Sequence, residues 1–111
     1  MSTIDLEKIL EYVAGFKRPL VKLVKGSLLA KSKTHFFGYG RLPDKPGISN
    51  DSITTHFITS CLSHKLKDKP LTVEVLKTVR NDDVEIKGMC SCKANINRCK
   101  HIVGFMLKLE R

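Results

Sequence analysis

Four side chains of the kinds that bind metals fall within twelve residues of this sequence. The segment reads C-S-C-K-A-N-I-N-R-C-K-H, and its candidate ligands are Cys90, Cys92, Cys99 and His101. Three thiolates and one imidazole nitrogen make a full tetrahedral set for Zn²⁺. Because protein ligands fill all four positions, the set predicts a structural ion and leaves no place for a substrate or a catalytic water.

The elements around these residues explain how they could converge. Residues 84–90 read as a strand, and alternation along its end directs the sulfurs of Cys90 and Cys92 to the same face. The segment between the two ligand pairs, 93–98, contains two asparagines and can turn the chain back. Residues 99–110 read as a helix, and a helix N-terminus favours the thiolate form of Cys99. We therefore expect the ion to join a strand end to a helix start.

Two other features of the sequence favour metal over disulfide chemistry. The start of the chain is amphipathic and acidic, unlike a secretory signal, and no apolar run is long enough to span a membrane. A cysteine cluster beside a histidine in an intracellular chain indicates a metal site. The fourth cysteine, Cys61, has a C-x-x-H spacing to His64 but is predicted to be a small buried strand residue. His35 and His56 are predicted to be ordinary core or surface residues.

The first half of the chain is expected to be helical. Apolar residues recur at helical spacing from Leu6 to Phe16, after a possible cap at Ser2 or Thr3 and before Pro19. Residues 20–33 fit either a helix broken near Gly26 or a short strand followed by a helix. Residues 41–51 combine Gly, Pro, Asn and Asp and are predicted to form a surface loop.

The second half alternates as strands do. Residues 56–64, 70–79 and 84–90 are separated by the charged turn 65–69 and the turn signal 80–83. The predicted fold is therefore α+β, with N-terminal helices, a three-stranded antiparallel meander, a zinc-stapled strand end and a C-terminal helix. We expect a helical part of uncertain role at 1–50 and the strands with the finger at 51–111, the finger itself covering about 84–110.

The charge of the chain points to polyanions. The 111 residues contain 20 Lys and Arg against 11 Asp and Glu, a formal net charge of +9. Such a balance attracts nucleic acid, although lysines that only solvate the surface would give the same count. One basic cluster lies in the N-terminal half, at Lys17, Arg18, Lys22 and Lys25. The candidate nucleic-acid contacts around the ligands are Lys87, Lys93, Arg98, Lys100 and Lys108.

The ligand spacing resembles a known family. The pattern C-x-C, a gap, then C-x-H, preceded by strands and followed by an apolar helix, is similar to the SWIM-type zinc finger, and the match covers about residues 70–110. The resemblance implies that Cys90, Cys92, Cys99 and His101 hold Zn²⁺. The family often has Pro where this chain has Ser91. The wider stretch from about His56 resembles SWIM modules of animal proteins, some of which also carry a YqaJ-type nuclease or other mobile-element machinery.

The resemblance implies a class of role. SWIM fingers occur in transposases, chromatin-remodelling enzymes, recombination factors and some ubiquitin ligases, and are taken to bind DNA or proteins. We therefore expect a DNA-binding module of a nuclear, chromatin-associated or mobile-element-derived protein. The alternative is a protein-interaction adaptor in a nuclear complex, with contacts from the first helix or from FFGY at 36–39. An enzyme is not expected, because the sequence has no paired carboxylates near a histidine and no glycine-rich nucleotide-binding loop. No membrane or small-molecule partner is expected.

Overall fold

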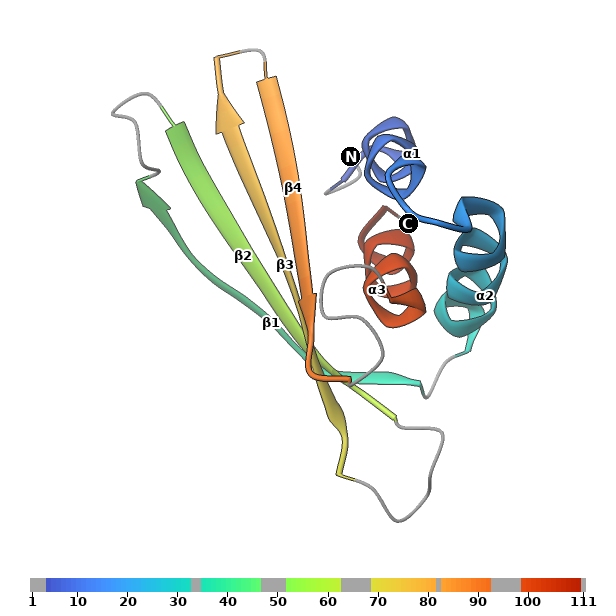
Figure 1. Ribbon diagram of the computed structural model, residues 1–111. Helices are drawn as coiled ribbons and strands as arrows, with labels where there is room; N and C mark the ends of the chain where they lie inside the picture. Colours follow the sequence, from blue (N-terminus) through green and yellow to red (C-terminus); the bar gives the residue numbers. More distant parts are fainter. Residues whose placement is uncertain are drawn as a thin grey trace.

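The computed structural model describes residues 4–32, 35–46, 52–62, 69–81, 83–92 and 99–110. Within them the chain folds as α+β, which confirms the predicted class, with three helices together on one side of an antiparallel sheet (Figure 1). The sheet has the strand order β1-β2-β3-β4. The elements are α1 (Leu6–Ala14), α2 (Pro19–Lys31), β1 (Phe36–Pro46), β2 (Ser52–Cys61), β3 (Leu71–Arg80), β4 (Asp83–Cys90) and α3 (Lys100–Glu110).

The sheet has four strands among the described residues, and the predicted three-stranded meander is wrong in this detail. The additional strand, β1, includes residues 41–46, which were predicted to be a loop; residues 47–51 lie outside the described part. β1 pairs antiparallel with β2 across two register shifts, and Gly38 adopts a φ of 65°. A bulged edge strand tolerates Gly and Pro, because one of its sides needs no ladder hydrogen bonds. The same residues that signalled a loop therefore fit an edge.

Helix α2 resolves the ambiguity of residues 20–33. It is one helix that begins at Pro19, where a missing N–H costs nothing, and it continues through Gly26 without a break. A Cβ added at Gly26 would lie 2.8 Å from Val103 Cγ1 and 3.0 Å from the Gly104 nitrogen. Glycine is thus kept inside α2 by close packing on α3 and does not end the helix.

Helix α1 follows its predicted pattern only in part. It begins after Asp5, and the expected caps Ser2 and Thr3 lie outside the described residues. Of the predicted apolar stripe, Ile9, Val13 and Phe16 are buried, whereas Leu6 and Leu10 are each 47% exposed.

The core forms between the helices and the inner face of the sheet. Alternate strand residues supply it as expected, and Thr59, which is buried among them, donates a hydrogen bond to the carbonyl of Phe37 at 2.8 Å. Helix α3 lies at the centre and contacts α1, α2, β3 and β4. The buried strand residues include Phe57, Cys61, Val73, Val75 and Cys90, and the helical ones include Ile9, Val13, Ile102, Val103, Phe105, Met106 and Leu107.

None of the helices within the described ranges is long and apolar enough to cross a membrane.

Candidate metal centre

Strand β4 supplies the first two cysteines of the cluster. Cys90 is the last residue of the strand and is 4% exposed, and Cys92 follows two positions later. Ser91, between them, holds this segment to β3 with two hydrogen bonds. Its N–H donates to the carbonyl of Thr72 at 3.0 Å, and its Oγ accepts from the Thr72 N–H at 2.9 Å. SWIM-type fingers often have proline at this position. Because proline has neither an N–H nor a hydroxyl, it could not form the two hydrogen bonds that Ser91 makes with Thr72.

Helix α3 supplies the other two candidate ligands. Cys99 directly precedes the helix, and its carbonyl accepts a hydrogen bond from the Val103 N–H at 3.4 Å. His101 lies in the first turn. Both side chains are buried, with 3% and 5% exposure. The helix start thus fixes two donor groups on the side that faces the end of β4.

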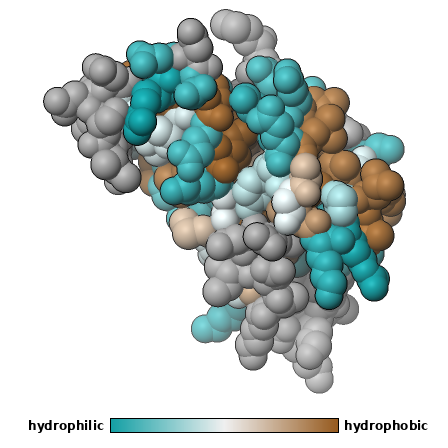
Figure 2. All heavy atoms as spheres, turned by 45° about the horizontal axis from the view of Figure 1, so that its top comes forward, coloured by the Kyte–Doolittle hydropathy of each residue, from teal (hydrophilic) through white to brown (hydrophobic). Residues whose placement is uncertain are grey.

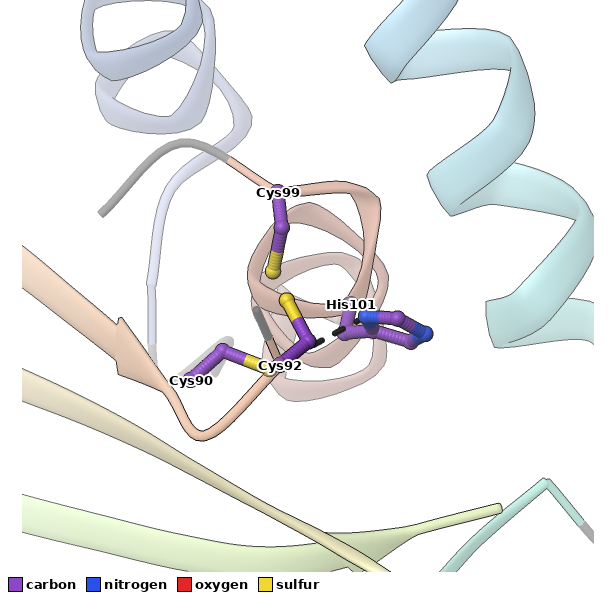
Figure 3. Close-up of side chains that lie close together, drawn as sticks. All are labelled: Cys90, Cys92, Cys99 and His101. Atoms are coloured by element: carbon purple, nitrogen blue, oxygen red, sulfur yellow. Dashed lines mark hydrogen bonds between the residues drawn. The ribbon is translucent and has the colours of Figure 1, made fainter. Parts of the chain in front are cut away.

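The four side chains converge on one point (Figure 3). One donor atom from each lies within 4.8 Å of every other, and Cys90 Sγ lies 3.8 Å from His101 Nδ1. Around a tetrahedral zinc ion, ligand atoms are separated by about 3.8 Å for two sulfurs and about 3.6 Å for sulfur and nitrogen, given the usual bond lengths. The cluster is therefore compatible with a bound metal ion, and the four cysteines of the chain form no disulfide with one another.

Hydrogen bonding between the thiols of the cluster shifts the pKa values of Cys90 and Cys99 in opposite directions. The pKa of Cys99 is lowered to about 4, first because the Cys90 thiol donates a hydrogen bond to its sulfur, and further by His101 and the helix N–H of Ile102, while burial opposes the shift. The pKa of Cys90 is raised, because its proton is held by Cys99 and because the thiol is buried. A divalent cation placed among these sulfurs would replace the shared proton and favour thiolate at each of them.

None of the other titratable candidates within the described residues belongs to the cluster, although Cys61 lies near enough for the charges of Cys99 and Cys92 to raise its pKa. Cys61 is a fully buried residue on β2, as predicted, and burial raises its pKa to about 12. His56 Nε2 lies 3.0 Å from Glu74 Oε1 across β2 and β3, and His35 has an edge contact with the ring of Phe36. His64 falls outside the described residues.

The predicted nucleic-acid residues within the described part of the chain lie on β4 and at the two ends of α3. Lys100 begins α3 next to the ligands, whereas Lys108 lies in the last turn of the same helix with its Nζ 5.9 Å from the centroid of Phe36. Lys87 is on the edge strand β4, 3.7 Å from Glu85. Lys93 and Arg98 lie outside the described residues.

Two other lysines lie beside Lys100, and they come from the N-terminal basic cluster. The pKa of Lys100 is lowered, first by partial burial of its ammonium group and then by the charges of Lys25 and Lys22 on α2. In the sequence these two lysines are far from the ligand segment, and no local pattern connects the two. Only the packing of α2 on α3 makes that connection.

Comparison of the chain with protein-family models, with curated proteins and with solved structures finds no match in any of the three.

Proposed function

We propose that this chain is a zinc-binding module of SWIM type that binds nucleic acid, with duplex DNA as its main ligand. Zinc is the preferred ion for three cysteines and a histidine in a closed set, of which Cys90, Cys99 and His101 are buried and Cys92 is partly buried. Four protein ligands leave the ion no open position, so its role is structural and the module is not an enzyme. Reduced thiols are stable inside cells. The DNA-binding role that the SWIM resemblance implies fits a location in the nucleus.

The observation that carries the proposal is the close approach of α2 and α3. Besides the contact at Gly26, a Cβ added at Gly104 would lie 3.1 Å from the carbonyl oxygen of Gly26. Two glycines at one crossing let the helix backbones approach closely. This brings Lys22 and Lys25 to Lys100, beside the metal ligands at the start of α3.

The resulting basic surface, Lys22, Lys25 and Lys100, has few opposing charges. No acidic side chain among the described residues forms an ion pair with Lys22 or Lys25. Lys22 lies in the first turn of α2 and Lys100 is the first residue of α3, so both helix N-termini add partial positive charge. Such a surface suits phosphate groups, and it predicts salt-dependent binding with little sequence preference.

The test is a fluorescence-anisotropy titration of the zinc-loaded chain with a random-sequence DNA duplex over a series of salt concentrations. We expect Lys22→Gln with Lys25→Gln to weaken binding and to reduce the slope of log K against log salt by about 2, since each phosphate contact contributes about 1. The matched control is Lys8→Gln with Arg41→Gln, which removes the same charge from residues that are paired with Glu11 and Asp44.

Two results would contradict the proposal. One is the absence of binding at low salt by the unmodified, zinc-loaded chain. The other is equal weakening by the two double variants, since that would assign the binding to net charge and not to the surface at α2 and α3.

A further inference from the structure

Helix α2 has a large apolar face that nothing in the described chain covers. Leu20 is 75% exposed, Leu28 63%, Val24 61% and Val21 41%. Leu20, Val24 and Leu28 follow one another at intervals of four residues, and Val21 is beside them, so the four side chains form one stripe along the helix. We call these four residues the α2 stripe. On the right of Figure 2, where α2 lies, apolar side chains adjoin long hydrophilic ones at the surface.

The α2 stripe is separate from the side of the helix that packs in the core. Gly26 and Ala30 are the buried residues of α2, and Leu23 and Leu29 are packed against the core at its margin. The helix is therefore apolar on both sides. A helix with a second apolar side that faces water is typical of an interaction surface.

The charges around the stripe indicate what kind of partner it fits. Lys17, Lys25 and Lys31 are exposed, and they lie before, beside and after the stripe. The sequence has no acidic residue between Glu11 and Asp44, although seven lysines and arginines lie in that interval. A partner with Asp and Glu beside its own apolar side chains would complement both features.

We propose that the α2 stripe binds an acidic amphipathic helix of a partner protein. The spacing of Val21, Val24 and Leu28, at i, i+3 and i+7, is that of anchor positions between two packed helices. A second copy of this chain is a poorer occupant, because pairing of two α2 helices would bring the same lysines together. A lipid surface is also less suitable, because two of the four side chains are short valines and none is aromatic.

This site adjoins the proposed nucleic-acid surface, and Lys25 lies at the border of the two. The stripe itself is formed by apolar side chains, whereas the nucleic-acid surface is formed by Lys22, Lys25 and Lys100. Serine substitutions within the stripe leave all charges in place. The two proposals can therefore fail separately.

The experiment titrates the zinc-loaded chain with a fluorescent designed helical peptide of about 18 residues, with Leu at the contact positions and Glu beside them. A second peptide has Lys in place of Glu. We expect the acidic peptide to bind with a Kd of about 10 μM, because the contact area is small, and the basic peptide to bind at least about tenfold more weakly.

The decisive variant is Leu20→Ser with Leu28→Ser, which should weaken binding of the acidic peptide by about tenfold or more. Its matched control is Leu6→Ser with Leu10→Ser, two exposed leucines on α1, which should bind the peptide like the unmodified chain. Zinc content and duplex binding should stay unchanged in both double variants. This would show that they are folded and that the nucleic-acid surface is intact.

Several outcomes would overturn the proposal. These are no binding of the acidic peptide, equal loss in the α1 and α2 variants, or binding that the α2 substitutions leave unchanged, as expected for attraction by charge alone. Self-association that Leu28→Ser abolishes would assign the stripe to a second copy. Stripe-dependent binding to phosphatidylserine vesicles, with no binding of the peptide, would assign it to a membrane surface.

Discussion

Helix α3 buries eight of its eleven residues, whereas α2, which packs against it, buries two of its thirteen. Both helices are rich in aliphatic side chains, and each has a glycine at their contact. The difference comes from position: α3 has α1, α2, β3 and β4 around it, and α2 leaves one side to solvent. An apolar helix can therefore serve as core or as an interaction surface, and its neighbours decide which.

The largest expected effect on stability comes from removing a candidate metal ligand between the end of β4 and the start of α3. Cys99→Ser should lose about one equivalent of zinc and lower the free energy of unfolding by more than about 4 kcal/mol, because the proposed ion would join β4 to the start of α3. Metal analysis and chemical denaturation measure the two changes. Cys61→Ala, which removes a buried thiol outside the cluster, should retain zinc. Unchanged zinc content in Cys99→Ser would refute the site.

A matched pair of substitutions compares the two helices directly. Leu107→Ala on α3, where the side chain is 7% exposed, should destabilise the fold by about 2–5 kcal/mol. Leu28→Ala on α2, at 63% exposure, should change stability by no more than about 0.5 kcal/mol. Denaturant melts of the zinc-loaded variants measure both values. Similar losses for the two leucines would contradict the view that α2 and α3 are used differently.

The contact between the helices can be tested at its glycines. Gly26→Ala should cost about 1–3 kcal/mol, because the added methyl group would overlap Val103 and move α2 away from α3. The same shift should weaken duplex DNA binding by separating Lys22 and Lys25 from Lys100. Gly15→Ala is the control, since within the described residues its Cβ would meet only the Tyr12 carbonyl oxygen, at 3.8 Å. Equal stability of the two variants would show that the helices do not depend on this close approach.

The smallest expected effect concerns the C-terminal end of α3. Lys108→Gln removes a cation 5.9 Å from the centroid of the Phe36 ring and should cost about 0.5–1 kcal/mol. Lys87→Gln, on the exposed edge of the sheet, should cost less than about 0.5 kcal/mol, because its ion pair with Glu85 is largely solvated. A thermal-unfolding comparison decides whether Lys108 acts in packing. No measurable difference between the variants would remove that role.

The structure also shows why the sequence-based prediction of the sheet was incomplete. Strands β2, β3 and β4 could be predicted, since each contains a stretch in which more and less buried positions alternate and each is bounded by turn residues. Strand β1 could not, because its Gly and Pro residues are typical of loops and it is stabilised by pairing with a distant segment, β2. Its φ of 65° at Gly38 and its register shifts have no regular sequence pattern.

Some features of the candidate metal centre could likewise be predicted from neighbouring residues, whereas others depend on contacts between distant segments. The types and spacing of Cys90, Cys92, Cys99 and His101 are contained in twelve residues, so the sequence by itself determined the donor set and the elements that hold it. The role of Ser91 required the tertiary structure, because its partner Thr72 is on another strand.

The surfaces depended most on tertiary structure. The sequence determined that α2 is basic and apolar, but it did not determine which of its sides would be covered. Because α2 packs against α3 at Gly26 and Gly104, Lys22 and Lys25 lie near Lys100. The opposite side of α2, with the α2 stripe, stays exposed. The physical reason is that ligand spacing and strand alternation are properties of neighbouring residues. The exposure of a helix side and the grouping of charges are set by contacts between segments far apart in the chain.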